Sequence, residues 1–185
     1  SRYKKFMEKK ESYNKTELMD FAGGLLGSER GKLPLPPMLM VDRIMKITEK
    51  GGKFNKGLVL AEMDIHPNKW FFECHFKDDP VMPGCLGLDA LWQLTGFFIS
   101  WIGGTGKGRA LGCGEVKFKG QIRPHHKKII YQLDIKKIIS KPIWMVLADA
   151  TVEVANKTIY FAKNVKVGFF ENLVYPSPKG ETEPF

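Results

Sequence analysis

Three polar side chains within an apolar stretch, Trp70–Trp101, could carry out acid–base chemistry. His75 lies among aromatic residues just before a proline- and glycine-containing turn, and Asp89 and Gln93 interrupt the apolar segment that follows. Histidine can accept a proton near neutral pH, and burial of an aspartate favours its protonated, proton-donating form. Asp89 and Gln93 are four residues apart, so they share a helix face on which the amide can orient the acid. We therefore predict that His75 and Asp89 form an acid/base pair, with a packed histidine and a buried structural acid as the alternatives.

The start of the apolar segment could bind an oxyanion. Pro83-Gly84 directly ahead of Cys85 is typical of a helix start. Free backbone N–H groups and the positive end of the helix dipole stabilise developing negative charge there, and glycine lets a ligand approach the backbone closely. We predict such a site at Gly84, and the alternative is a plain helix entry.

Several competing motifs are incomplete. Gly106-Lys107 lacks the upstream glycine and the following Ser/Thr of a phosphate-binding loop, and no G-x-S-x-G elbow is present. Cys74, His75 and Cys85 could in principle bind zinc, but adjacent Cys-His is poor chelating geometry and a fourth ligand is missing. We therefore expect neither a metal ion nor an organic cofactor.

The charge of the chain indicates an acidic partner or a generally solvated basic surface. The 185 residues carry a formal net charge of +9. Basic residues are concentrated in Lys117–Lys141 without regularly interleaved aromatics, which favours an anionic protein over nucleic acid. An anionic membrane surface is a further alternative.

The sequence favours a reducing, cytoplasmic compartment. The three cysteines cannot all pair within the chain, and residues 1–15 lack the apolar region of a secretory signal. Cys85–Ile102 has about the minimum length of a membrane span, but Asp89 and Gln93 interrupt it. We expect it to be a helix buried inside the fold, without membrane insertion.

Hydrophobic periodicity predicts an α+β architecture. The pattern predicts a short helix within residues 12–26, the apolar helix after Gly84, and a series of strands. The expected strands are Met38–Thr48, Leu58–Ile65, Ala110–Ile122, Ile129–Ile135, Trp144–Val154 and Ile159–Phe169. A helix that is apolar nearly all round must be covered on most sides, which a curved antiparallel sheet would do. We expect one domain over residues 1–185, with an N-terminal helical extension at 1–30 and a flexible tail at 172–185.

Residues 70–94, WFFECHFKDDPVMPGCLGLDALWQL, resemble the signature of the bacterial 3-hydroxydecanoyl-acyl carrier protein dehydratase/isomerase family. The stretch from Leu35-Pro36 to Asp42-Arg43 and the run GKGRALGCGEVKF at 106–118 are similar to that family too. The similarity extends over roughly Glu11 to Phe170. It implies a hot-dog fold, in which an antiparallel sheet wraps a long central helix. It also implies a homodimer with active sites at the subunit interface, each taking its histidine from one chain and its aspartate from the other.

The resemblance also implies roles for individual residues. His75 matches the catalytic histidine, Asp89 the catalytic acid, and Gly84 the glycine whose N–H polarises the thioester carbonyl. Cys85, Gln93 and Phe76 fall in the same block and are expected to bind substrate. Lys136, Lys137 and Lys141 lie where the family presents carrier-docking residues, although Pro142 follows where another basic residue is expected.

The activity implied is dehydration of a medium-chain 3-hydroxyacyl group on acyl carrier protein, an acidic partner, followed by isomerisation of the trans-2 to the cis-3 product. Related dehydratases that do not isomerise resemble this pattern but have glutamate in the acid position, so Asp89 favours the bifunctional type. The alternatives are a dehydratase without isomerase activity and a non-catalytic acyl-binding protein of the same fold.

Overall fold

The computed structural model describes residue 6 and residues 8–172, 174–176 and 182–184. The described helices are α2 (Lys15–Ala22), α3 (Trp70–Cys74) and α4 (Gly84–Trp101). The described strands are β1 (Arg43–Thr48), β2 (Leu58–Asp64), β3 (Lys107–Gly112), β4 (Glu115–Phe118), β5 (Lys128–Ile139), β6 (Trp144–Val154), β7 (Lys157–Phe170), β8 (Val174–Pro176) and β9 (Thr182–Pro184).

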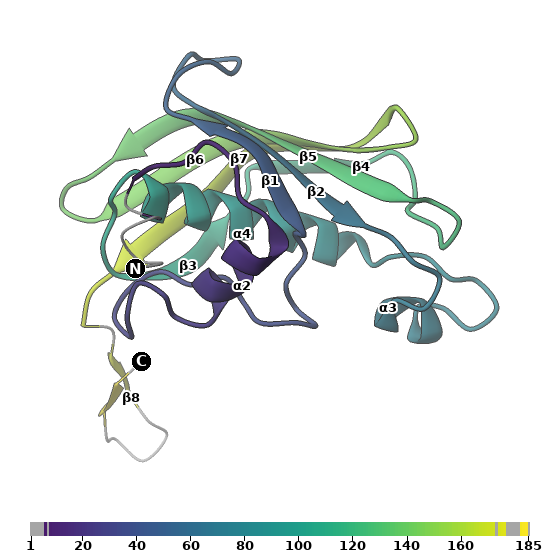
Figure 1. Ribbon diagram of the computed structural model, residues 1–185, viewed down its shortest axis with the longest axis horizontal. Coiled ribbons are helices and arrows are strands. Elements are labelled where there is room, and N and C mark those ends of the chain that lie inside the picture. The colour runs from purple at the N-terminus through teal and green to yellow at the C-terminus, as the bar shows by residue number, and fades with distance from the viewer. Residues whose placement is uncertain (1–5, 7, 173, 177–181, 185) are drawn as a thin grey trace.

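A curved antiparallel sheet wraps the long helix α4 (Figure 1). The sheet order is β1-β2-β5-β6-β7-β3, and β4 also pairs with β7. Each of these pairings is antiparallel. The predicted α+β arrangement, a sheet curved around a central helix, is therefore confirmed.

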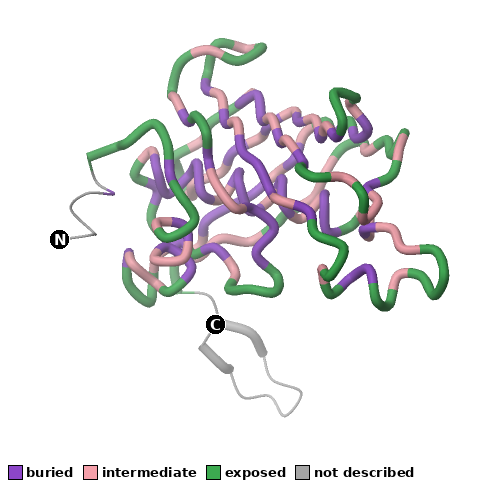
Figure 2. The backbone as a smooth tube through the Cα atoms, turned by 45° about the vertical axis from the view of Figure 1, so that its right-hand side comes forward, coloured by how far each residue is buried: buried purple, intermediate pink, exposed green. Residues whose placement is uncertain are grey.

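The core lies between α4 and the concave face of the sheet. Phe97, Phe98 and Ile99 of α4 are almost fully buried, and Tyr131 of β5 and Val165 of β7 are fully buried. Figure 2 shows the buried residues gathered in the centre and the exposed ones along the loops. Each large apolar side chain removed from water in this way contributes about 1.5–3 kcal/mol. This burial fixes α4, and with it Asp89, relative to the sheet.

The segment before β1 differs from the sequence prediction. We predicted a strand over Met38–Thr48, but β1 begins at Arg43. The backbone of Met38 and Met40 binds side chains of α4 and β5 in place of a neighbouring strand. Alternation of apolar residues cannot reveal such partners, because they lie far away in the sequence.

The predicted strand Ala110–Ile122 is divided into β3 and β4. Strand β3 ends at Gly112, whose φ of +148° lies in a region that L side chains rarely adopt, and the register against β7 shifts just before this residue. Both pieces pair with β7, which is long enough to receive them in succession. The short helix α3 was not predicted, and it ends directly before His75.

Helix α2 begins with a capping box formed by Asn14 and Glu17. Asn14 Oδ1 accepts a hydrogen bond from Glu17 N (2.9 Å), and Glu17 Oε1 accepts one from Asn14 N (3.2 Å). These reciprocal bonds satisfy N–H groups that the first turn leaves without partners. The capping box thus fixes the start of α2 beside β1.

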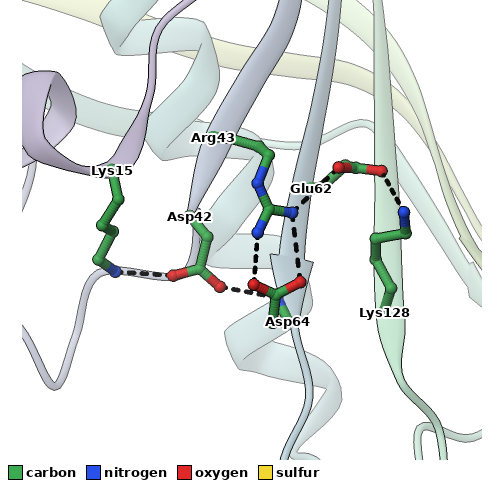
Figure 3. A network of polar contacts seen from close by, with 6 residues as sticks. All are labelled: Lys15, Asp42, Arg43, Glu62, Asp64 and Lys128. Atoms are coloured by element: carbon green, nitrogen blue, oxygen red, sulfur yellow. Dashed lines mark hydrogen bonds and ion pairs between the residues drawn. The ribbon is translucent and has the colours of Figure 1, made fainter.

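A network of charged side chains connects α2 to the sheet (Figure 3). Its members are Lys15, Asp42, Arg43, Glu62, Asp64 and Lys128. Burial alone would raise the pKa of Asp42, but hydrogen bonds from Lys15 Nζ (2.7 Å) and Asp64 N (2.7 Å) outweigh it and lower that pKa. Asp42 is thus a charged anchor between the N-terminal region and β2.

Parts of both chain ends are outside the described residues. These are residues 1–5 and 7 of the predicted N-terminal extension, and residues 173, 177–181 and 185 of the predicted flexible tail at 172–185. Within that tail, β8 and β9 pair antiparallel. Among the described residues, no helix combines the length and hydropathy that a membrane span requires.

Candidate active site

His75 is the residue directly after α3, and its ring is fixed by a backbone carbonyl. Nδ1 of His75 lies 2.7 Å from the carbonyl oxygen of Val81. A carbonyl oxygen only accepts hydrogen bonds, so Nδ1 carries the proton in the neutral ring and Nε2 is left with a free lone pair. This tautomer is suited to accept a proton at Nε2.

The loop that carries His75 is closed by backbone hydrogen bonds. Val81 N donates to the His75 carbonyl oxygen (2.8 Å), so the same two residues are joined by main chain and side chain. Phe76 and Asp79 exchange two further bonds of 2.7 and 3.0 Å, and Arg123 binds the Asp79 carboxylate at 2.7 Å. The histidine is therefore positioned by its loop, which leads directly into α4.

Asp89 lies in the second turn of α4 and is held by Gln93, as the four-residue spacing predicted. Gln93 Nε2 donates to Asp89 Oδ2 at 2.7 Å and to the carbonyl oxygen of Met38 at 3.0 Å. Gln93 Oε1 accepts from Met40 N at 3.0 Å. Since the Gln93 amide is 8% exposed and bonded on both sides, it holds the Asp89 carboxyl in one orientation. Asp89 itself is half-buried, unlike the fully buried acid that the apolar helix suggested.

The first turn of α4 begins at Gly84, as predicted from Pro83-Gly84. Pro83 provides no side-chain cap, and within the described residues the Gly84 N–H has no backbone acceptor. Such free N–H groups and the positive helix end favour an anionic oxygen. The arrangement is suited to polarise a carbonyl next to the His75 loop.

Two aromatic rings set how closely this turn approaches the sheet. A Cβ added to Gly84 would lie 3.2 Å from the Phe118 ring, and one added to Gly87 would lie 2.5 Å from the Tyr160 ring. Phe118 and Tyr160 pack edge to face, with ring centroids 4.7 Å apart. Burial raises the pKa of Tyr160 to about 12, and the nearby Cys85 adds to the rise. The glycines therefore allow the first turn of α4 to lie directly against β4 and β7.

A small cavity of about 150 Å³ opens beside the acid. Asp89, Gln93 and Gly96 line it from one face of α4, and strands β3 and β7 supply the opposite wall. Lys32 and Arg109 also line it, so the acid shares this cavity with two basic side chains.

The structure does not join His75 to Asp89 within one chain. Over the described residues, His75 bonds to Val81 and Asp89 to Gln93, with no hydrogen bond or ion pair between the histidine and the acid. The resemblance implies that the two residues meet between subunits, and this stays a prediction.

The other predicted substrate-binding residues lie beside these groups. Phe76 stacks on His75 with ring centroids 3.8 Å apart, and its side chain is 54% exposed. Cys85 is exposed in the first turn of α4, and its thiol is free. Over the described residues, no group of three or more His, Cys, Asp or Glu side chains is arranged to hold a metal ion.

The three predicted carrier-docking lysines differ in their surroundings. Lys136 Nζ binds Asn164 Oδ1 at 3.0 Å and Asp149 Oδ1 at 3.5 Å, so part of its charge is balanced within the chain. Lys137 and Lys141 are exposed. The latter two are therefore better placed to meet an anionic partner.

Three features of the site were missed in the sequence. Neither the Val81 carbonyl that fixes His75 nor the Met38 and Met40 backbone groups that bind Gln93 have a side-chain signature. The third feature is Tyr131 of β5, whose hydroxyl donates to the Met40 carbonyl at 2.9 Å. In the sequence, Tyr131 was only one of the alternating residues on the core face of the predicted strand Ile129–Ile135.

Comparison with known proteins identifies the type of domain. The sequence model of the FabA-like domain family matches residues 33–163, which is more than half of the chain. The matched part includes His75, Gly84, Asp89, Gln93 and the three predicted docking lysines.

Solved structures share the fold at low sequence identity. The dehydratase heterocomplex ApeI:P from Xenorhabdus doucetiae has a TM-score of 0.57 at 12% identity, covering 80% of this chain and 90% of that chain. AziG of S. sahachiroi has a TM-score of 0.50 at 8% identity, covering 69% and 90%. The uncharacterized protein PH1136 from Pyrococcus horikoshii has a TM-score of 0.50 at 11% identity, covering 71% and 85%. With the sheet order and central helix described above, these likenesses confirm the predicted hot-dog fold.

Proposed function

Since the chain belongs to the FabA-like domain family, we propose that it is a hydro-lyase that dehydrates 3-hydroxyacyl thioesters and then isomerises the product. The observation that carries the proposal is the fixed tautomer of His75. With Nδ1 donating to the Val81 carbonyl, Nε2 is free to act as a base. A histidine that only fills space in a core would not need a fixed tautomer with Nε2 free, beside a helix N-terminus that has no side-chain cap.

Dehydration needs a base, an acid and an oxyanion site. The Gly84 N–H, at the positive end of α4, binds the thioester oxygen and acidifies the C2 proton. His75 Nε2 removes that proton, and protonated Asp89 gives its proton to the departing 3-hydroxyl, which leaves as water. The C2–C3 bond becomes double, and the product is the trans-2-enoyl thioester.

Isomerisation uses the same groups a second time. A proton is removed from C4, the double bond shifts to C3–C4, and a proton is returned to C2 to give the cis-3-enoyl thioester. His75 is the proposed proton carrier, because a histidine can both accept and donate near neutral pH. The shorter aspartate side chain at position 89, where glutamate would be the alternative, supports the bifunctional activity.

We propose that the acid reaching His75 is Asp89 of the partner subunit. The unpaired outer edges of β3 and β4 support this proposal, because these strands pair with β7 alone among the described strands. Leu111 and Phe118 are 41% and 53% exposed there, which is unusual for large apolar side chains. A second copy covering this edge would bury them and bring two sites together.

The proposed substrate carrier is an acidic acyl carrier protein. The net charge of +9 and the exposed Lys137 and Lys141 support it, because opposite charge increases the rate of encounter. Of the three lysines predicted for docking, Lys136 contributes least to this interaction, since Asp149 and Asn164 hold its amine.

Product analysis tests the proposed activity. The purified protein is incubated with a 3-hydroxydecanoyl thioester, and the products are separated by chromatography. We expect both trans-2 and cis-3 products, and a loss of turnover by about 100-fold or more in His75→Ala and in Asp89→Asn. Trans-2 product alone would reject the isomerase activity, and binding without turnover would identify a non-catalytic acyl-binding protein.

A further inference from the structure

Tyr131, on the sheet, is connected to the Asp89 carboxyl through the Met40 backbone and the Gln93 amide by three hydrogen bonds, of which the first two are buried and the last is part-buried. Tyr131 Oη donates to the Met40 carbonyl oxygen at 2.9 Å. The N–H of the same residue, Met40, donates to Gln93 Oε1 at 3.0 Å. Gln93 Nε2 then donates to Asp89 Oδ2 at 2.7 Å. The chain therefore runs from β5 through the segment before β1 to the proposed catalytic acid on α4.

The direction of this chain fixes the orientation of the Gln93 amide. Met40 N–H can only donate, so it selects the oxygen of the Gln93 amide and turns the Nε2 group toward Asp89 and the Met38 carbonyl. Displacement of the Met40 peptide would change the position of that oxygen. Whatever holds Met40 in place therefore also determines where the Asp89 carboxyl points.

Tyr131 is suited to hold Met40. Its side chain is fully buried, and its ring is fixed in the core of the sheet. Burial is the main cause of a raised pKa for Tyr131, so the hydroxyl keeps its proton and remains a donor at neutral pH. The described side-chain hydrogen bonds to residues 38–40 come from Gln93 and Tyr131, so Tyr131 is the one that ties the segment to the sheet.

We propose that Tyr131 is a positioning residue that acts on Asp89 through the Met40 peptide and Gln93, an inference that rests on the proposed function. Tyr131 touches neither substrate nor reacting atoms. Its hydroxyl holds the Met40 backbone in a fixed position beside α4. The Gln93 amide is thereby oriented so that Nε2 donates to Asp89. Loss of the hydroxyl lets the peptide and the amide shift, and the acid is then less often aligned with the 3-hydroxyl.

The test is Tyr131→Phe, with Tyr13→Phe as the matched control. Tyr13 is also buried, but within the described part of the chain its hydroxyl makes no hydrogen bond of acceptable geometry. Both changes remove one buried hydroxyl and keep the ring. Turnover of the 3-hydroxydecanoyl thioester is measured per folded protein, at a temperature where circular dichroism shows both variants folded. We expect kcat to fall about tenfold in Tyr131→Phe with little change in KM, and to stay within about twofold of the native value in Tyr13→Phe.

A double-mutant cycle separates positioning from a general loss of stability. If Tyr131 acts through the acid, Tyr131→Phe has no further effect on the residual turnover of Asp89→Asn. An equal tenfold effect in both backgrounds would overturn the proposal, and so would a native kcat in Tyr131→Phe. If the native protein shows no turnover at all, the proposed function and this inference both fail. If the native protein turns over but the variants behave in either of these two ways, only this inference fails.

Two further replacements keep the test valid if Tyr131→Phe does not fold. 4-Methylphenylalanine at position 131 fills the space of the hydroxyl without donating, and 4-aminophenylalanine restores an N–H donor at the same ring position. We expect the methyl variant to lose turnover about tenfold and the amino variant to recover most of it. Equal turnover in the two variants would overturn the role assigned to the hydrogen bond.

Discussion

Alanine substitution at two glycines of α4 should change stability in opposite directions. Gly87 and Gly96 lie on the same buried helix. A Cβ at Gly87 would be 2.5 Å from Cε2 and 3.2 Å from Cδ2 of Tyr160. A Cβ at Gly96 would meet nothing closer than Phe169 and Val167, each at 3.9 Å. Since carbon atoms pack best at about 3.5–4.0 Å, only the first change creates an overlap of about 1 Å.

The magnitude follows from two effects. Alanine is favoured over glycine inside a helix by about 1 kcal/mol, because the unfolded chain loses less entropy. Overpacking of a core costs about 1–3 kcal/mol, sometimes more. We therefore expect Gly87→Ala to lower the free energy of unfolding by up to about 2 kcal/mol and Gly96→Ala to raise it by about 0.5–1 kcal/mol.

Urea unfolding followed by tryptophan fluorescence measures both values, at one fixed protein concentration because association also stabilises. Tyr160→Leu in the Gly87→Ala background should recover part of the loss, since it removes the ring that the new methyl group meets. Equal effects at the two positions, or a stabilising Gly87→Ala, would refute the close approach of α4 to β7 described above.

Other changes test the acid and its supports. Gln93→Leu leaves the buried Met40 N–H without an acceptor, so we expect the free energy of unfolding to fall by about 1–3 kcal/mol and kcat to fall at least tenfold. Thr95→Val, two residues further along α4, should leave kcat unchanged, and equal turnover loss in both variants would contradict the role of Gln93. The pKa of Asp42 in the folded protein lies below its ordinary value, so the charged carboxylate stabilises the fold. This stabilisation is fully present above the unfolded-state pKa of about 4, and it is lost as the pH falls through the lower pKa of the folded state. The stability difference between the native protein and Asp42→Asn should therefore be largest at neutral pH and shrink below about pH 4 in acid titrations, and a constant difference would show that the charge is not responsible.

The sequence allowed prediction of the elements that have strong local patterns. The alternating faces of β5, β6 and β7 and the apolar run after Gly84 predicted the sheet and α4 correctly, because burial on one side imposes their periodicity. The Asn14/Glu17 capping box gave the start of α2 for the same local reason. By contrast, Met38–Met40 looks like part of a strand in sequence but is held by Gln93 and Tyr131, which are more than 50 residues away.

The site was predictable in its side chains and not in its backbone partners. His75, Asp89 and Gly84 stand out because a histidine, an acid and a Pro-Gly start are unusual in so apolar a stretch. The Val81 carbonyl that fixes the histidine tautomer has no such signal, since every residue carries a carbonyl group. Long-range hydrogen bonds of this kind depend on the packed fold and become visible only with it.

The central claim is that one active site is made by His75 of one chain and Asp89 of the partner subunit. It is tested most directly by mixing two inactive variants, His75→Ala and Asp89→Asn, after unfolding and refolding them together. Random pairing makes half of the dimers hybrids, each with one intact site, so we predict recovery of about one quarter of the native turnover. No recovery above the separate variants, although hybrid dimers are detected by mass spectrometry, would contradict a site shared between chains.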